Sequence, residues 1–127
     1  MDLLRLGGMA ILGAGVVNTI LGLVADAAGV AMAVKGFGSN SREAIPVFAY
    51  MVSTLMGGVI GLVLAFFMKR SGAAKKSFYI ATGVLTVVSF IGPLTADTST
   101  GTKITLELMH VVAALIIIPA LAKSLRN

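Results

Sequence analysis

The sequence has no cysteine and no tryptophan, and only 12% of its 127 residues carry a charge. Without cysteine, disulfide scaffolds and Cys-ligated metal sites are excluded. Charged residues make up about a quarter of a typical soluble domain, so a small soluble monomer with this composition could not cover its core with polar surface. A hydrophobic share of 57% also excludes a disordered chain. These absences leave an integral membrane protein.

Four long apolar stretches follow one another along the chain. A helix needs about 20 residues to cross about 30 Å of hydrocarbon, and each stretch is close to that length. None alternates apolar and polar residues with a period of two, as a membrane β-strand does. The sequence therefore predicts an all-α membrane protein, a single-domain antiparallel bundle of four transmembrane helices with spans at residues 6–25, 45–68, 77–96 and 104–122.

The basic residues predict the orientation of the spans, because Lys and Arg collect in cytoplasmic loops. Seven of the ten fall on the cytoplasmic side if the N-terminus is inside: Arg5, Lys69, Arg70, Lys75, Lys76, Lys123 and Arg126. The expected topology is N-in/C-in. The basic cluster at residues 69–76 lies between two spans and has no interleaved aromatic residue, so we expect contact with the lipid bilayer and no nucleic-acid partner.

The connection between the first two spans contains a second apolar stretch, Ala27–Val34, which is too short to cross the membrane. It either extends the first helix or lies at the outer surface. Asn40 followed by Glu43 resembles a capping box at the start of the second helix. Pro46 would then interrupt the second turn, so a helix start near Ala44 is an equal alternative.

Small residues predict where the spans pack, because apolar faces gain little from meeting one another in lipid. Gly15 and Gly22 on the first span and the pair Gly57-x-x-x-Gly61 on the second are the expected packing positions. The pair on the second span fits packing within the bundle or between subunits equally well. We expect a homo-oligomer, and a dimer is one such form.

The fourth span differs from the others because it carries ionisable residues. Lys103, Glu107 and His110 lie at i, i+4 and i+7 and share one helix face. Polar residues of the other spans lie at similar depth when 1.5 Å is counted per residue. The sequence predicts a polar site open to the outside and composed of His110, Glu107, Asn18, Thr54 and Ser89, with Asp26 at its mouth.

Two interpretations of this site remain open. Ionisable residues within a span often mark the path of an ion, proton or solute, and imidazole gains and loses a proton near physiological pH. Glu107 and His110 are therefore candidates for binding a small solute or cation, with coupling to a proton. In the structural alternative, Glu107 extends to the outer lipid headgroups or pairs with Lys103, while His110 hydrogen-bonds Asn18 or a hydroxyl and locks the bundle. The protein would then be a subunit of a larger membrane complex, with no ligand of its own.

Metal and catalytic sites are not expected. Glu107-x-x-His110 has the spacing used in di-iron bundles, but such a site needs two of these motifs and two further Glu residues. No local motif supplies a nucleophile with an adjacent base. We therefore predict no metal, no cofactor and no catalytic residue, and favour a protein that is not an enzyme.

The last third of the chain resembles a known family. The features that carry the resemblance are Gly92-Pro93-Leu94, a Thr-rich connection, the step Met109-His110 and a following Ile118-Pro119. They are similar to a family of small bacterial four-span membrane proteins of unknown function. The resemblance implies a bacterial cytoplasmic (inner) membrane location and brings no activity with it. Small multidrug exporters resemble the chain in size and span count only, because their membrane carboxylate lies in the first span, where this chain has Asn18.

Overall fold

The computed structural model describes residues 2–35 and 40–127. In this part of the chain the order of elements is α1 (Leu3–Ala27), β1 (Ala33–Lys35), β2 (Arg42–Ala44), α2 (Val47–Arg70), α3 (Lys75–Ser89), α4 (Ile91–Thr95) and α5 (Thr100–Ala122). Taken together, α3 and α4 form one apolar unit, Lys75–Thr95, so four helical units are long and apolar enough to cross a membrane. The prediction of a mostly helical chain with four such stretches is confirmed.

The first two helices begin after residues that suit the N-cap position. The Asp2 side chain accepts a hydrogen bond of 2.8 Å from the backbone N–H of Arg5 and caps α1. Pro46 occupies the N-cap position of α2, where its missing N–H costs nothing. The capping box at Asn40 and Glu43 is therefore wrong, because Glu43 lies in β2 rather than in a helix.

The third span is interrupted near its end, whereas the sequence predicts an unbroken helix there. Pro93 has no N–H to offer the carbonyl of Ser89, and this is where α3 ends. Phe90 joins α3 to α4 and accepts a hydrogen bond of 3.1 Å from the N–H of Leu94. The bend places the ring of Phe90 beside α5, where it contacts the imidazole described below.

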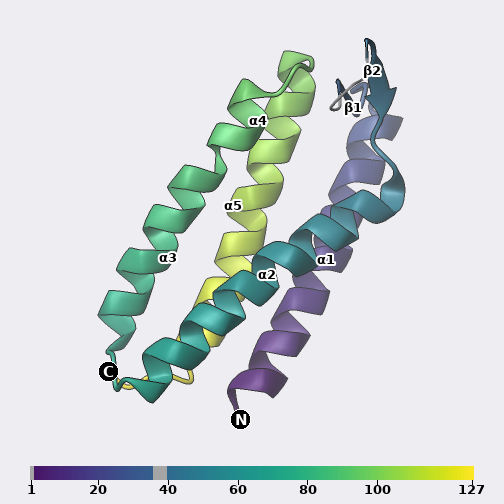
Figure 1. Ribbon diagram of the computed structural model, residues 1–127. Helices are drawn as coiled ribbons and strands as arrows, with labels where there is room; N and C mark the ends of the chain where they lie inside the picture. The colour runs from purple at the N-terminus through teal and green to yellow at the C-terminus, as the bar shows by residue number, and fades with distance from the viewer. Residues whose placement is uncertain (1, 36–39) are drawn as a thin grey trace.

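A short hairpin follows α1 at the end of the molecule opposite the two chain termini (Figure 1). Its strands β1 and β2 are antiparallel, with Ala33 opposite Ala44. The connection between α4 and α5 holds it in place: the N–H of Lys35 donates to the carbonyl of Asp97 at 3.0 Å, and the Thr98 hydroxyl donates to the carbonyl of Ala33. The apolar stretch after α1 thus neither crosses the membrane nor continues the helix; it leads into this hairpin.

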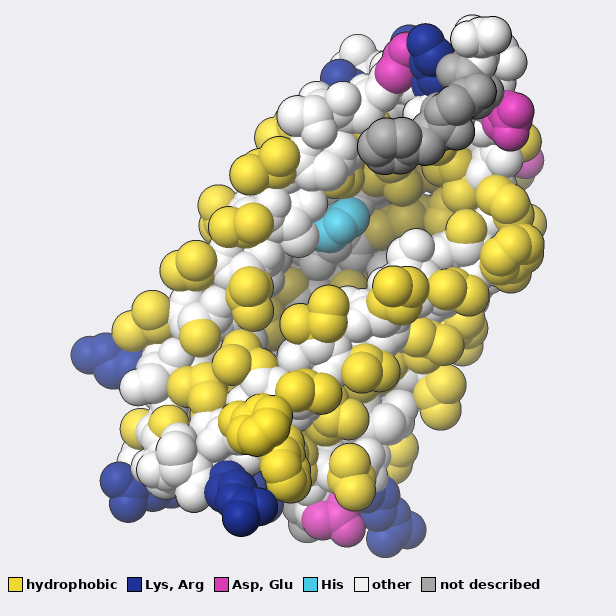
Figure 2. Space-filling view, in the orientation of Figure 1, with side chains coloured by type: hydrophobic (Ala, Val, Ile, Leu, Met, Phe, Trp, Pro, Cys, Tyr) yellow, Lys and Arg dark blue, Asp and Glu magenta, His cyan; other side chains and the backbone are white. Residues whose placement is uncertain are grey.

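Two apolar clusters hold the helices together. The larger one lies toward the termini and joins α1, α2, α3 and α5 through residues such as Ile11, Ala65, Phe78 and Leu121. The smaller one, Met32, Tyr50 and Met109, lies toward the hairpin. Many large apolar side chains of all four spans remain exposed on the outside of the molecule (Figure 2). This distribution suits a protein whose solvent is lipid rather than water.

Candidate functional site

A cavity of about 510 Å³ lies between the helices. Val34 and Ile45, from the hairpin region, line one end, and Gly61 and Leu121 line the other. At 1.5 Å per residue, its lining on α5 from residue 106 to residue 121 extends over about 22 Å. Figure 2 shows the single histidine through an opening in the side of the molecule, between α2 and the α3–α4 unit. The sequence predicts an opening toward the outside, whereas this one lies along the length of the helices.

His110 lines the cavity from α5 and is held by two contacts. Its Nδ1 lies 2.7 Å from the carbonyl oxygen of Leu106, one turn earlier. Because a carbonyl only accepts hydrogen bonds, Nδ1 must carry the proton, and Nε2 of the neutral ring is then an acceptor. The ring also meets Phe90 edge to face, with centroids 6.3 Å apart. Nε2 is thus the ring nitrogen left for a ligand.

Asn18 is 3% exposed and connects three helices. Its Nδ2 donates to Thr54 Oγ1 at 3.0 Å and to the carbonyl of Met109 at 3.2 Å. The Thr54 hydroxyl donates its own proton to the carbonyl of Tyr50, so both partners of Asn18 Nδ2 act as acceptors. The orientation of the Asn18 amide is therefore fixed. Asn18 Oδ1 is buried and accepts no hydrogen bond from the described residues. Asn18 therefore joins the helices of the bundle and leaves one fully buried acceptor unsatisfied.

The hydroxyl groups of the cavity wall are also mainly acceptors. Four of them donate to carbonyls of their own helices, three or four residues earlier, and keep only lone pairs for another partner. These residues are Thr54, Thr82, Thr86 and Ser89. Together with Nε2 of His110, they form a wall that suits a ligand with hydrogen-bond donors or a positive charge.

Two of the six predicted site residues, Glu107 and Asp26, do not line the cavity. Lys103 donates from Nζ to the carbonyl of Leu94 at 3.1 Å, and His110 contacts Phe90, so this face of α5 is turned toward α4. Glu107 lies between them on the same face; its Oε1 is buried and has no partner among the described residues. Asp26 is exposed near the end of α1. The structure brings together the other four: His110, Asn18, Thr54 and Ser89.

The contacts required by the structural alternative are not those observed. Within residues 2–35 and 40–127, Lys103 forms no ion pair with Glu107, and His110 bonds its own helix rather than Asn18 or a hydroxyl. In the same residues, no group of three His, Asp or Glu side chains could hold a metal ion.

The whole chain matches one known protein family. The model of a family of unknown function, DUF6069, matches residues 1–127. The chain belongs to the DUF6069 family. No curated protein and no solved structure matches it. The match extends over the whole chain, whereas the resemblance found in the sequence rests on the last third. Membership of DUF6069 brings no activity with it, so the function must be argued from the site.

In this DUF6069 member the two predicted packing glycines of α1, Gly15 and Gly22, face α2 closely. A Cβ atom at Gly22 would lie 2.5 Å from Cε2 of Tyr50, and one at Gly15 would overlap the sulfur of Met51. On α2 the predicted pair behaves differently. Gly57 and Gly61 line the cavity, and a Cβ at Gly57 would meet no atom within 4 Å. Packing of this pair against another subunit stays a prediction.

Two closely packed glycines, Gly58 and Gly7, are not predicted from the sequence. A Cβ at Gly58 would lie 2.6 Å from Cγ1 of Ile11, and one at Gly7 would lie 2.8 Å from Cδ1 of Leu62. Gly58 lies four residues after Thr54 and eight after Tyr50, so the three share one helix face. This spacing indicates the packing role of Gly58, but the prediction was based on the Gly57-x-x-x-Gly61 pair instead.

Removing the Asn18 side chain beyond Cβ is expected to weaken the bundle measurably. Asn18→Ala loses both interhelical hydrogen bonds, and we expect a loss of about 1–2 kcal/mol, the range of such bonds in membrane proteins. A double-mutant cycle with Thr54→Val should give a coupling energy of about 0.6 kcal/mol. Steric trapping in bilayers measures both quantities.

The matched control is Thr19→Val, which removes a hydroxyl bonded only to the carbonyl of Gly15 in its own helix. We expect this substitution to change the free energy of unfolding by less than about 0.5 kcal/mol. Equal effects of Asn18→Ala and Thr19→Val, or a coupling energy of zero in the cycle, would contradict the role of Asn18 in joining the helices.

Proposed function

We propose that this DUF6069 member is a multi-pass protein of the bacterial cytoplasmic membrane that binds a small solute or cation at a polar site centred on His110. The observation that carries the proposal is the orientation of His110, which lines the cavity with Nδ1 bonded to the carbonyl of Leu106 and Nε2 left as an acceptor. An acceptor without a donor costs free energy in apolar surroundings, and a ligand that donates a hydrogen bond to Nε2 would recover it.

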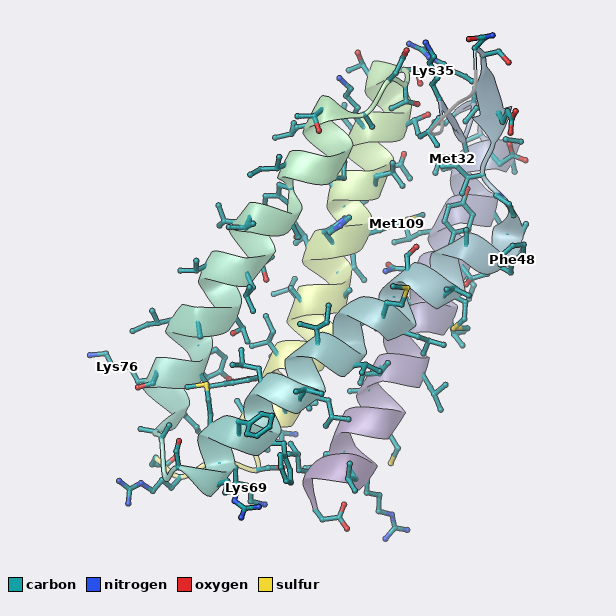
Figure 3. All side chains as sticks on the ribbon, in the orientation of Figure 1. Met32, Lys35, Phe48, Lys69, Lys76 and Met109 are labelled. Carbon is teal, nitrogen blue, oxygen red and sulfur yellow. The ribbon has the colours of Figure 1, made fainter. Side chains whose placement is uncertain are left out.

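The proposed topology is an antiparallel bundle with both termini in the cytoplasm. Figure 3 places Lys69 and Lys76 at the end of the molecule that carries the termini, and Lys35 at the hairpin end. Seven of the ten basic residues belong to segments at the end with the termini, which the positive-inside rule assigns to the cytoplasm.

The absence of native cysteine allows a direct test of this topology. Single-cysteine variants Asn40→Cys and Ser71→Cys place a thiol beside the hairpin and between α2 and α3, respectively. A membrane-impermeant maleimide applied to intact spheroplasts should label Asn40→Cys, and should label Ser71→Cys only after permeabilisation. Labelling of Ser71→Cys in intact spheroplasts would overturn the proposed orientation.

The single histidine makes ligand binding observable at one residue. With ¹⁵N in the imidazole, the protein in phosphatidylcholine nanodiscs gives one pair of ring-nitrogen resonances. We expect n-butanol, a neutral donor, or methylammonium, a cation, to shift the Nε2 resonance saturably, and the shift to weaken in Asn18→Ala but not in Thr19→Val. No saturable shift with either probe would overturn the proposed binding function.

The alternative function is a structural subunit of a larger membrane complex or homo-oligomer. A shallow groove on the outer face of α3, lined by Tyr79, Gly83 and Val87 among others, favours it. Native mass spectrometry from nanodiscs distinguishes the two functions. A stable assembly together with unresponsive His110 resonances would support the subunit function.

A further inference from the structure

We propose that the ligand of this site is a single-chain amphiphile from the bilayer, with a hydrogen-bond-donating head at His110 and Asn18 and its hydrocarbon chain in the apolar part of the cavity. This inference rests on the proposed binding function and names the class of ligand and its route of access. It is carried by how polarity is distributed along the cavity, by the cavity's length and by the position of its opening.

The cavity is polar in its middle, at the level of His110, and apolar from there toward the chain termini. On α5 the polar lining ends at His110, and every later lining residue is Ala, Ile or Leu as far as Leu121. On α2 it ends at Thr54, after which the lining is glycine and Ile60. On α3 the hydroxyl of Thr82 lies lower but is bonded to the carbonyl of Phe78. A ligand that fills this space needs a polar head and an apolar tail.

The apolar part has the length of a hydrocarbon chain. From His110 to Leu121 the helix rises about 17 Å, at 1.5 Å per residue. With C–C bonds of about 1.5 Å, a zigzag chain advances a little over 1 Å per carbon, so about 13 carbons fit this length. The cavity volume of about 510 Å³ lies within the range of small-ligand sites.

The opening faces the region where lipid would surround the bundle. It lies between α2 and the α3–α4 unit (Figure 2), and apolar side chains such as Ile60 on α2 and Val87 on α3 are 61% and 65% exposed on these helices. At the hairpin end the cavity is lined by the apolar residues Val34 and Ile45. An apolar molecule already dissolved in the bilayer therefore has a shorter and less polar path to His110 than a water-borne solute.

Selectivity in this site comes from the head group. A hydrocarbon tail gains little by moving from lipid into an apolar cavity, because both surroundings are equally apolar. A donor that reaches Nε2 of His110 satisfies an acceptor that an ether or alkane leaves unpaired. An alcohol should therefore bind about tenfold or more tightly than its methyl ether.

The test compares tetradecan-1-ol, 1-methoxytetradecane and n-butanol by the ¹⁵N resonances of His110 in phosphatidylcholine nanodiscs. All concentrations are expressed as mole fractions in the bilayer. We expect tetradecan-1-ol to shift Nε2 at a mole fraction at least tenfold below that of 1-methoxytetradecane and no higher than that of n-butanol. A tetradecan-1-ol with a diazirine at the end of its chain should, on irradiation, label residues 113–121 of α5 or 57–61 of α2.

The outcomes separate this inference from the function on which it rests. If tetradecan-1-ol acts only at a higher mole fraction than n-butanol, or the diazirine labels only outward-facing residues, the amphiphile is wrong and the polar site stands. If the ether acts as well as the alcohol, the assigned head-group contact is wrong. If no compound shifts Nε2, both the inference and the proposed function fail.

Discussion

Gly22→Ala is expected to destabilise the protein by about 1–3 kcal/mol, the usual cost of forcing an extra carbon into a packed interface. The new Cβ would lie 2.5–2.8 Å from three atoms of the Tyr50 ring. Tyr50 is itself buried and packs with Met32 and Met109, so the rigid ring cannot move without disturbing the small cluster below the hairpin. Steric trapping or thermal unfolding in nanodiscs measures the change in free energy.

Gly13→Ala on the same helix is the matched control, because a Cβ there would meet no atom within 4 Å. Alanine is also the better helix former, so this substitution should be neutral or stabilise by up to about 1 kcal/mol. Similar effects of the two substitutions would show that α1 does not approach α2 as closely as described.

Gly57→Leu is expected to lower the affinity for tetradecan-1-ol at least tenfold without unfolding the protein. Gly57 lines the cavity one turn from Thr54, at the boundary between its polar and apolar parts. A Cβ at this position would meet nothing within 4 Å, so the leucine side chain would occupy space that the hydrocarbon tail needs. The free energy of unfolding should change by less than about 1 kcal/mol, since helix propensity improves while no packed contact is lost.

Gly13→Leu provides the control for this substitution too, because it adds the same side chain to an exposed position of α1. It should leave the response of the His110 resonances to tetradecan-1-ol unchanged. The response of Gly57→Leu to n-butanol should also survive, because the polar end of the cavity is untouched. Unaltered tetradecan-1-ol affinity in Gly57→Leu would contradict the assigned position of the tail.

The spans were predictable because length and hydropathy alone decide whether a helix can cross a bilayer. The hairpin was not, because its pairing depends on contacts distant in sequence, such as that of Lys35 with Asp97. The bend at Phe90 was not predictable from hydropathy, which shows residues 77–96 as one apolar stretch. Pro93 leaves the carbonyl of Ser89 without a donor, and α3 ends there.

The sequence predicts that the site residues of α5 share one helix face. It does not predict how α5 is rotated about its own axis. Spacing alone groups Glu107 with His110. The hydrogen bond from Asn18 to the carbonyl of Met109 and the packing of Met109 turn Leu106, His110 and Ala113 toward the cavity, and Glu107 lies outside the lining. Which residues of a helical face enter a cavity depends on such contacts between helices, and sequence periodicity does not contain them.

The central claim is that the imidazole of His110 presents an acceptor nitrogen to the cavity. It is tested most directly by the ¹⁵N chemical shifts of the single histidine in ligand-free nanodiscs, at a pH where the ring is neutral. The account predicts the tautomer with the proton on Nδ1, bonded to Leu106, and with Nε2 unprotonated. A ring protonated on Nε2 would contradict it, because Nδ1 could not then donate to that carbonyl and no acceptor would remain for the ligand.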